Sequence, residues 1–473
     1  MAYRLSPVCR ASKLSYGNNL FLIHSARHVR AFHVPSESPE NLPQTPWDSS
    51  KSEAAAAAPT AVVRPSPPQR ILDRMPTASL LRSIMLQTVM SRPRLMDMAS
   101  TVIHRNVQFL TGNALFRFLL DNMFYAQFCA GRTEAEIRET VEGLRSMGYR
   151  GVILAYAREV DLSNSQFQSG TADSDALHKE HVAQWLQGTL RTINYAQRGD
   201  YVAVKYTGAG IGCVHALETG QNPDNLMADA LEQICASARK QEVKLLFDAE
   251  HYVQKAGIDS WTMDLMQKYN RDGQTVVYNT YQMYLKESTA TLESHLRMAQ
   301  EGKFSLGVKL VRGAYINSDP RHLIHDTKED TDRAFNNAAV MLATQHIDNP
   351  SAPKIGLVLA SHNKESTEMM RELRQEQLRR GLPLADVVYA QLMGMADELS
   401  MSLTQKVPDL EEENNHVFKY VVWGTTQECM MYLLRRAEEN RDAVERSSVS
   451  KQALWEELRG RLTLPSLLDR RGS

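Results

Sequence analysis

Eight short apolar runs, mostly separated by helical stretches, limit how this 473-residue chain can fold more than any other feature. The runs are Gly151–Tyr156, Tyr201–Tyr206, Val243–Phe247, Thr275–Tyr278, Ser305–Leu310, Ile355–Ala360, Val387–Leu392 and Val417–Val422. Helical periodicity marks Leu226–Lys240, Met283–Glu301, Thr331–Gln345, Lys364–Arg380 and Thr426–Arg441. The runs are continuously apolar, as is typical of parallel strands that are covered on both faces. The pattern therefore predicts an α/β fold, a (β/α)8 barrel of the TIM type, with an open doubly wound sheet as the alternative.

Polar residues stand at the ends of six of these runs. They are Lys205, Asp248 with Glu250, Asn279, Lys309 with Arg312, the triplet Ser361, His362 and Asn363, and Gln391. A buried parallel strand has no structural need for a charge at its end, whereas barrel active sites are built at the C-terminal ends of the strands. We therefore expect these side chains to share one polar mouth.

The first part of the chain differs in composition from the rest. Residues 1–34 contain Arg4, Arg10, Lys13, Arg27 and Arg30 but no acidic residue, which indicates a mitochondrial transit peptide, with a disordered basic tail as the alternative. Residues 35–70 are rich in Ser, Pro and Ala and predict a disordered linker. Apolar residues at helical spacing predict a helical arm over residues 71–130, ahead of the barrel over residues 131–473.

The overall composition excludes several classes of protein. The 54 Lys and Arg residues nearly balance the 55 Asp and Glu residues, so no basic excess indicates nucleic acid binding. The five cysteines form no CxxC pair, which argues against a disulfide framework or a structural zinc site. Closely spaced His pairs lack further ligands, so we predict no metal. No apolar run is long enough to predict a membrane-spanning helix.

The motif that follows the fifth run combines two cations with small residues. Lys309 and Arg312 flank an apolar pair, and Gly313 and Ala314 follow them. Positive charge and a close approach to the backbone are what an anionic or electron-rich ligand requires. The structural alternative is a strand with solvated ends.

A second motif lies in the last helical stretch. Tyr432, Arg435, Arg436 and Glu439 occupy one face of a helix. Two adjacent guanidinium groups suit a carboxylate ligand, because each offers a fork of donors, and Glu439 would support and orient an arginine. A salt-bridged surface helix is the structural alternative.

From about Gly131 to Asn440 the chain resembles the proline dehydrogenase family, a family of flavin-dependent barrels. Five segments carry the resemblance, in the family's order: Tyr278–Lys286, Lys309–Tyr315, Ala360–Asn363, Gln391–Met395 and Tyr432–Asn440. The resemblance implies a flavoprotein that binds FAD, oxidises L-proline to Δ1-pyrroline-5-carboxylate and passes the electrons to membrane quinone. It also implies a peripheral association with the inner mitochondrial membrane, on its matrix side.

The resemblance further implies a role for individual residues. Lys309 would lie near the flavin N5, with Asp248 in the same active centre. The residues expected to line the isoalloxazine and ribityl chain are Arg312, Gly313, Ala314 and Tyr315. Those expected to contact other parts of FAD are Asn279, Gln391, Ser361, His362 and Asn363. Those expected to hold the substrate carboxylate are Lys205, Arg435 and Arg436, while Tyr420, Tyr432 and Leu392 would pack on the pyrrolidine ring. Bacterial members usually carry Arg where this sequence has Lys309, which keeps the charge but lacks the planar fork of donors.

Two alternatives to proline oxidation remain at this point. One is a hydroxyproline dehydrogenase, which by resemblance would carry a small residue at the position of Tyr420. The other is a barrel without catalytic activity that binds an amino acid.

Overall fold

A computed structural model describes residues 71–90, 117–118, 120–158, 172–405, 416–430, 432–436 and 448–462. The chain divides into one unit over Met1–Ser66 and another over Pro67–Ser473, and every described residue belongs to the second unit. The predicted transit peptide over residues 1–34, the predicted linker over residues 35–70, and Glu439 lie outside the described residues.

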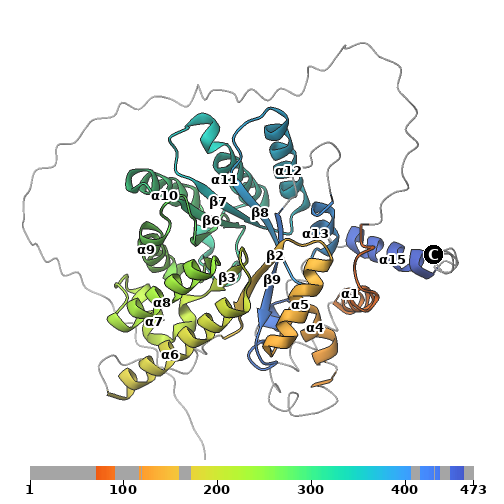
Figure 1. Ribbon diagram of the computed structural model, residues 1–473, viewed down its shortest axis with the longest axis horizontal. Helices are drawn as coiled ribbons and strands as arrows, with labels where there is room; N and C mark the ends of the chain where they lie inside the picture. Colours follow the sequence, from red (N-terminus) through yellow and green to blue (C-terminus); the bar gives the residue numbers. More distant parts are fainter. Residues whose placement is uncertain are drawn as a thin grey trace, which may run out of the picture. The chain divides into compact units, whose positions relative to one another are not determined.

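Eight parallel strands close into a barrel (Figure 1). They are β2 (Gly151–Tyr156), β3 (Tyr201–Val204), β4 (Lys244–Phe247), β5 (Val277–Gln282), β6 (Leu306–Val311), β7 (Ile355–Ala360), β8 (Asp386–Leu392) and β9 (His416–Trp423). Neighbouring strands pair in chain order, and β9 pairs with both β8 and β2, so the sheet has no open edge there. The predicted (β/α)8 fold is confirmed, and the open doubly wound sheet is wrong.

Alternate strand residues face the barrel interior and the surrounding helices, and both sets are buried. On β4, Leu246 belongs to the interior cluster, whereas Leu245 packs in the cluster beneath the helices. This arrangement explains the continuous apolar runs, because both faces of each strand are removed from water. Inside the barrel the Tyr201 ring contacts the rings of Tyr278 and Phe418 edge to face, with centroids 5.6 and 5.1 Å apart.

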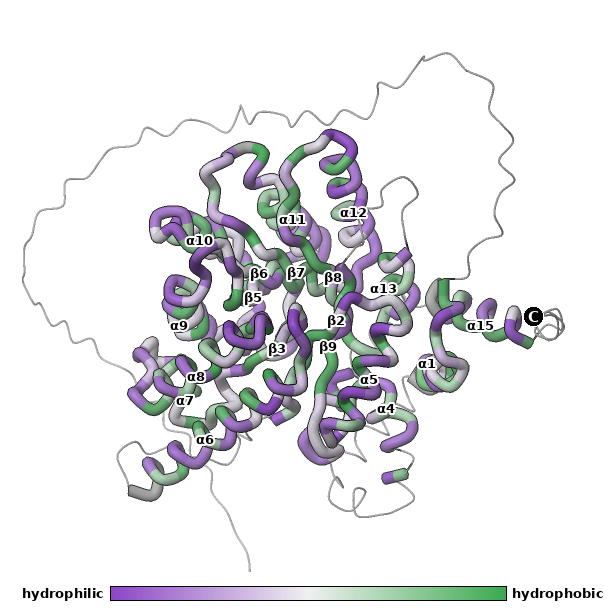
Figure 2. Tube along the Cα trace, in the orientation of Figure 1, coloured by the Kyte–Doolittle hydropathy of each residue, from purple (hydrophilic) through white to green (hydrophobic). Residues whose placement is uncertain are grey.

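Helices surround the barrel, and Figure 2 shows hydrophobic strands at the centre of the molecule and helices that carry both hydrophobic and hydrophilic residues. The helices that follow the strands are α6 (Ala172–Tyr195), α7 (Ile211–Glu218), α8 (Asn225–Gln241), α9 (Tyr252–Tyr269), α10 (Ser288–Gly302), α11 (Lys328–Asp348), α12 (Lys364–Arg379) and α13 (Asp397–Leu403). Side-chain caps fix where several of them begin. Asp224, Thr327 and Asn363 each accept a hydrogen bond from a backbone N–H in the first turn.

The structure corrects two of the predicted boundaries. The predicted strand over Thr275–Tyr278 begins only at Val277 and continues to Gln282 as β5. The predicted helix over Met283–Glu301 begins only at Ser288. The residues between them form a turn, in which the Ser288 hydroxyl donates to the backbone carbonyl of Gln282 at 2.6 Å.

The predicted helical arm is only partly a separate element. It contains α1 (Thr77–Met90), the π-helical turn η1 (Asp121–Tyr125) and α4 (Ala126–Phe128), but its last residues form β1 (Cys129–Gly131), which pairs with the C-terminal end of β9. Helix α5 (Glu134–Ser146) follows, and α1 packs against α15 (Ser448–Leu462) near the C-terminus. The segment that precedes the barrel in the sequence therefore contacts the C-terminal end of β9. Within the described residues, no helix is both long and apolar enough to cross a membrane.

Candidate active site at the barrel mouth

Three residues from separate strands form a polar cluster at the C-terminal end of the barrel. Asp248 follows β4, Lys309 lies on β6 and Tyr420 on β9. The Lys309 ammonium donates to Asp248 Oδ1 at 2.6 Å, and the Tyr420 hydroxyl donates to Asp248 Oδ2 at 2.8 Å. Asp248 and Lys309 are 7% and 6% exposed, and a buried charge is tolerated when it is paired in this way.

The electrostatics of this cluster keep Tyr420 protonated. Burial raises the pKa of Tyr420 far above its usual range, and the negative charge of Asp248 raises it further. The Lys309 ammonium also lies 5.2 Å from the centroid of the Tyr420 ring. The cluster is thus a carboxylate that accepts from two fixed donors, an ammonium and a phenol.

A second group of charges meets around Tyr315, in the loop after β6. Burial raises the pKa of Tyr315, and the positive charges of Lys205 and Arg435 oppose this shift. The negative charges of Glu250 and Asp248 raise the pKa of Tyr315 further. Residues after β3, β4 and β6 therefore share one site with the helical segment that carries Arg435.

Tyr432 and Arg436 form the wall of the site on that helical segment. The Arg436 guanidinium lies 4.9 Å from the centroid of the Tyr432 ring, and the two residues are 7% and 6% exposed. Tyr432 belongs to the apolar cluster against which Tyr420 and Leu392 pack. Apolar side chains therefore adjoin the helical segment that carries Arg435 and Arg436.

The backbone after β6 is open beside Lys309. Gly313 and Ala314 are exposed, and the Ala314 N–H donates to Gln282 Oε1 at 3.1 Å. Gly313 has a φ of +158°, and a Cβ atom there would lie 2.4 Å from the ring of Tyr284, so a larger residue does not fit. Sequence reasoning missed Gln282, although its position on the same strand face as Tyr278 could have indicated it.

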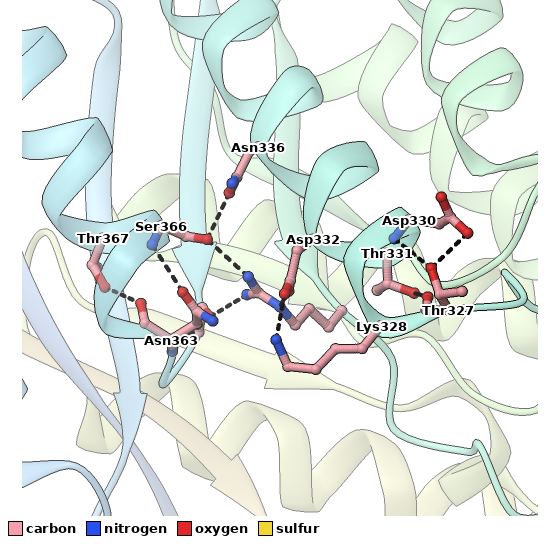
Figure 3. A network of polar contacts seen from close by, with 11 residues as sticks. Thr327, Lys328, Asp330, Thr331, Asp332, Asn336, Asn363, Ser366 and Thr367 are labelled. Atoms are coloured by element: carbon pink, nitrogen blue, oxygen red, sulfur yellow. Dashed lines mark hydrogen bonds and ion pairs between the residues drawn. The ribbon is translucent and has the colours of Figure 1, made fainter. Parts of the chain in front are cut away.

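Arg312 ties β6 to two helices. Its guanidinium pairs with Asp332 of α11 at 2.7 Å and donates to Ser361 at 2.7 Å and to Ser366 of α12 at 2.8 Å. Figure 3 shows Ser366 directed from α12 toward Asn336 of α11, to which its hydroxyl donates at 2.6 Å. Asn363 caps α12, since its side chain accepts from the Ser366 N–H at 2.8 Å. Arg312 therefore holds the rim on which Ser361 and Asn363 lie.

The structure does not bring Asn279 and Gln391 into the mouth. Both lie on the helix-facing side of their strands. The Asn279 amide donates to Asp259 of α9 at 2.7 Å, and the Gln391 amide donates to the Ser361 carbonyl at 3.2 Å. His362 is exposed at the rim, where its Nε2 accepts from the Leu392 N–H at 3.1 Å.

No group of three or more residues able to hold a metal ion occurs among the residues that the structure describes.

Comparison with known proteins identifies the family of this chain. The family model described as proline dehydrogenase matches residues 137–449. A protein named probable mitochondrial proline dehydrogenase from Schizosaccharomyces pombe is 29% identical over 397 residues, which cover 72% of this chain and 79% of that protein. A protein named hydroxyproline dehydrogenase from Rattus norvegicus is 28% identical over 438 residues, which cover 81% of this chain and 92% of that protein.

Solved structures show the same fold. Proline utilization A from Bdellovibrio bacteriovorus matches with a TM-score of 0.56 at 17% identity. The match covers 77% of this chain but only 37% of that protein, which is much longer. Because the family model matches well over half of the sequence, this chain belongs to the proline dehydrogenase family.

Proposed function

We propose that this chain oxidises L-proline to Δ1-pyrroline-5-carboxylate, with FAD as its cofactor and a membrane quinone as electron acceptor. The observation that carries the proposal is the meeting of the Asp248–Lys309–Tyr420 cluster with the helical segment of Arg435 and Arg436 at one barrel mouth. Family membership supplies the reaction type, and this geometry supplies a site of matching chemistry.

The residues at the rim of β6 and β7 fit a flavin. A flavin is planar and gains negative charge on reduction, so it requires open backbone and nearby cations. Gly313 and Ala314 offer exposed backbone beside Lys309, and His362 is exposed on the neighbouring strand end. FAD would be held by Lys309, Arg312, Gly313, Ala314, Tyr315, Ser361, His362 and Asn363. When bound, FAD supplies the redox chemistry by accepting the two electrons that leave proline.

The other side of the site would hold and orient proline. Arg435, Arg436 and Lys205 would bind its carboxylate, while Tyr420, Tyr432 and Leu392 would contact its ring. Fixing the ring in one orientation can remove much of the barrier, because the reacting carbon is then presented in a single geometry. The positive charges of the site also favour loss of the amine proton, which proline must release before it can be oxidised.

Hydroxyproline is the second candidate substrate, since relatives from rat, cow and mouse carry that name. Tyr420 favours proline over hydroxyproline. Its hydroxyl is held by Asp248, so the ring cannot turn freely to admit a 4-hydroxyl group.

Localisation follows from similar proteins. The relatives from Schizosaccharomyces pombe and Dictyostelium discoideum are named mitochondrial. We propose that this chain acts on the matrix side of the inner mitochondrial membrane, where it would associate peripherally and reach quinone.

A turnover assay tests the proposal. The purified protein is given L-proline and a soluble quinone, and the pyrroline product is measured together with quinone reduction. We expect the two to appear in equal amounts. A folded, flavin-loaded protein that binds proline but yields no product would instead be a binding barrel, and faster turnover of trans-4-hydroxy-L-proline would identify a hydroxyproline dehydrogenase.

A further inference from the structure

The segment before the barrel contacts the start of the helical segment that carries Tyr432, Arg435 and Arg436. β9 ends at Trp423, and Gly424 turns the chain with a φ of +146°. The Tyr125 hydroxyl donates to the Gly424 carbonyl at 2.6 Å, and the Gly424 N–H donates to the Gly131 carbonyl at 3.1 Å. The turn into the helical segment is therefore bound from η1 and from β1.

An ion pair on the same side binds the next residues. Arg132 Nη2 lies 2.5 Å from Asp121 Oδ1 and donates to Thr426 Oγ1 at 2.8 Å. The Thr426 hydroxyl in turn donates to Asp121 Oδ1 at 2.8 Å. Each of the three side chains thus contacts the other two, and we call Asp121, Arg132 and Thr426 the latch. The Arg132 guanidinium also lies 4.3 Å from the centroid of the Tyr125 ring.

Apolar packing continues along the helical segment. Leu120 and Phe124 pack against Met430 and Leu434. Tyr125 and Phe128 share a cluster with Tyr432. Leu434 directly precedes Arg435, so the contact reaches the residues that would bind the carboxylate.

We propose that the latch sets the position of the helical segment and thereby of the guanidinium groups of Arg435 and Arg436. The latch residues are positioning residues, since none of them belongs to the mouth cluster. The argument rests on the proposed function, in which these arginines hold the carboxylate of proline. Charge-assisted hydrogen bonds to a carboxylate depend on distance and direction, so a displaced helix start would weaken the binding of proline.

The same turn is also held by contacts that do not involve the latch, which makes the latch separable from folding. Thr425 and Glu428 form a reciprocal capping box, in which the Thr425 N–H donates to Glu428 Oε2 at 2.7 Å. The Tyr156 hydroxyl donates to Glu428 Oε1 at 2.7 Å. Loss of the latch should therefore shift the segment without preventing it from forming.

The test compares Thr426→Val and Arg132→Met with the unchanged enzyme. Thr426→Val keeps the volume of the side chain and removes only its hydroxyl. We expect KM for L-proline to rise about tenfold in both variants, with kcat within about twofold. Tetrahydrofuran-2-carboxylate, which keeps the ring and carboxylate but lacks the amine, should lose affinity in parallel. Arg132→Lys keeps the charge and should recover part of the affinity.

Arg138→Met is the matched control, because Arg138 on α5 is exposed and pairs within its own helix, with Glu134. It should leave KM unchanged. Flavin content and thermal midpoint are measured for every variant. The proposal is overturned if Thr426→Val leaves KM unchanged, or if kcat, flavin content and thermal midpoint fall together without a selective effect on KM. Failure of the unchanged enzyme to oxidise proline would overturn the proposed function instead.

Discussion

Tyr420 contributes to two features of the site at once, because its hydroxyl fixes Asp248 and its ring lies in the apolar wall. Tyr420→Ser would leave space beside the substrate ring. It would also increase the distance between the hydroxyl at position 420 and Asp248. We expect weaker turnover of L-proline and a ratio of catalytic efficiencies that narrows or reverses toward trans-4-hydroxy-L-proline. Apolar pockets reject an added hydroxyl by roughly 100-fold, so the unchanged enzyme should prefer proline without excluding the other substrate. The check is kcat/KM for both substrates in both proteins, and an unchanged ratio would contradict the role of Tyr420.

Arg436 is the more buried of the two adjacent arginines and is stacked on Tyr432. Arg436→Met should raise KM for proline strongly, by an amount equivalent to about 2–3 kcal/mol, since a charge-assisted hydrogen bond and a cation–π contact are both lost. Arg435→Met should act in the same direction. Flavin content should stay constant in both variants. Loss of flavin with unchanged proline affinity would show that these arginines do not bind the carboxylate.

His295 gives the stability of the protein a defined pH dependence. Burial lowers the pKa of His295 from its ordinary value of 6.5, and its ring nitrogen is hydrogen-bonded to Tyr281 at 2.8 Å. Below pH 6.5 the unfolded chain binds a proton at this residue that the folded protein does not, until the pH reaches the lowered folded pKa. The free energy of unfolding should therefore decrease as the pH is lowered from 6.5 to the pKa of His295 in the folded protein, by at most about 1.4 kcal/mol per pH unit.

His295→Gln should remove this contribution to the pH dependence of the free energy of unfolding. Urea unfolding of both proteins between neutral pH and pH 5 measures it. Equal slopes in the two proteins would mean that His295 contributes nothing to the pH dependence.

Individual residues also show where sequence reasoning stops. Lys309 and Asp248 were predicted to share one centre, and the structure brings them into contact. Asn279 was predicted beside the flavin but faces α9, whereas Gln282 faces the mouth. The two lie on opposite faces of β5, and the predicted strand ends at Tyr278, so the alternation of faces along the strand does not extend to Asn279 or Gln282 in the sequence prediction.

At the scale of elements, the loop after β8 depends on a buried ion pair. Lys419 on β9 is 1% exposed and pairs with Asp397 of α13 at 2.8 Å. Its ammonium also donates to the Met395 carbonyl at 3.0 Å. Burial lowers the pKa of Lys419, and Asp397 opposes that shift. The pair thus holds the loop that begins at Leu392.

Lys419→Met should lower the free energy of unfolding by about 3–5 kcal/mol, because it removes the buried ionic partner of Asp397. The additional change Asp397→Leu should recover part of the loss, which a double-mutant cycle by urea unfolding would measure. A loss below about 1 kcal/mol in the single variant would show that the pair is not coupled to folding.

Some helices and strands could be predicted from the sequence and others could not, for physical reasons. The eight apolar runs were found because strands buried on both faces are apolar throughout. Helix α9 was not found, since apolar and polar residues are mixed around it and polar Asp259 and Thr262 are buried. β1 was not found either, because three residues are too few for a pattern, and only pairing with β9 makes them a strand.

At the scale of the whole molecule, import is a separate prediction that rests on composition. Residues 1–34 are basic and free of acidic residues, so they should direct a fused fluorescent reporter to mitochondria. A control fusion with Arg4, Arg10, Arg27 and Arg30 changed to Gln should stay in the cytosol. A cytosolic location of the unchanged fusion would contradict the prediction.

Transfer of electrons from proline to a flavin bound at the barrel mouth can be followed directly. Its most direct measurement is the visible absorbance of the purified, oxygen-free protein during addition of L-proline without any other electron acceptor. We expect the flavin absorbance to be lost on addition of L-proline, and we expect the Arg436→Met variant to require a much higher proline concentration for the same loss. A folded, flavin-loaded protein that keeps its absorbance at saturating L-proline would contradict electron transfer from proline to the flavin.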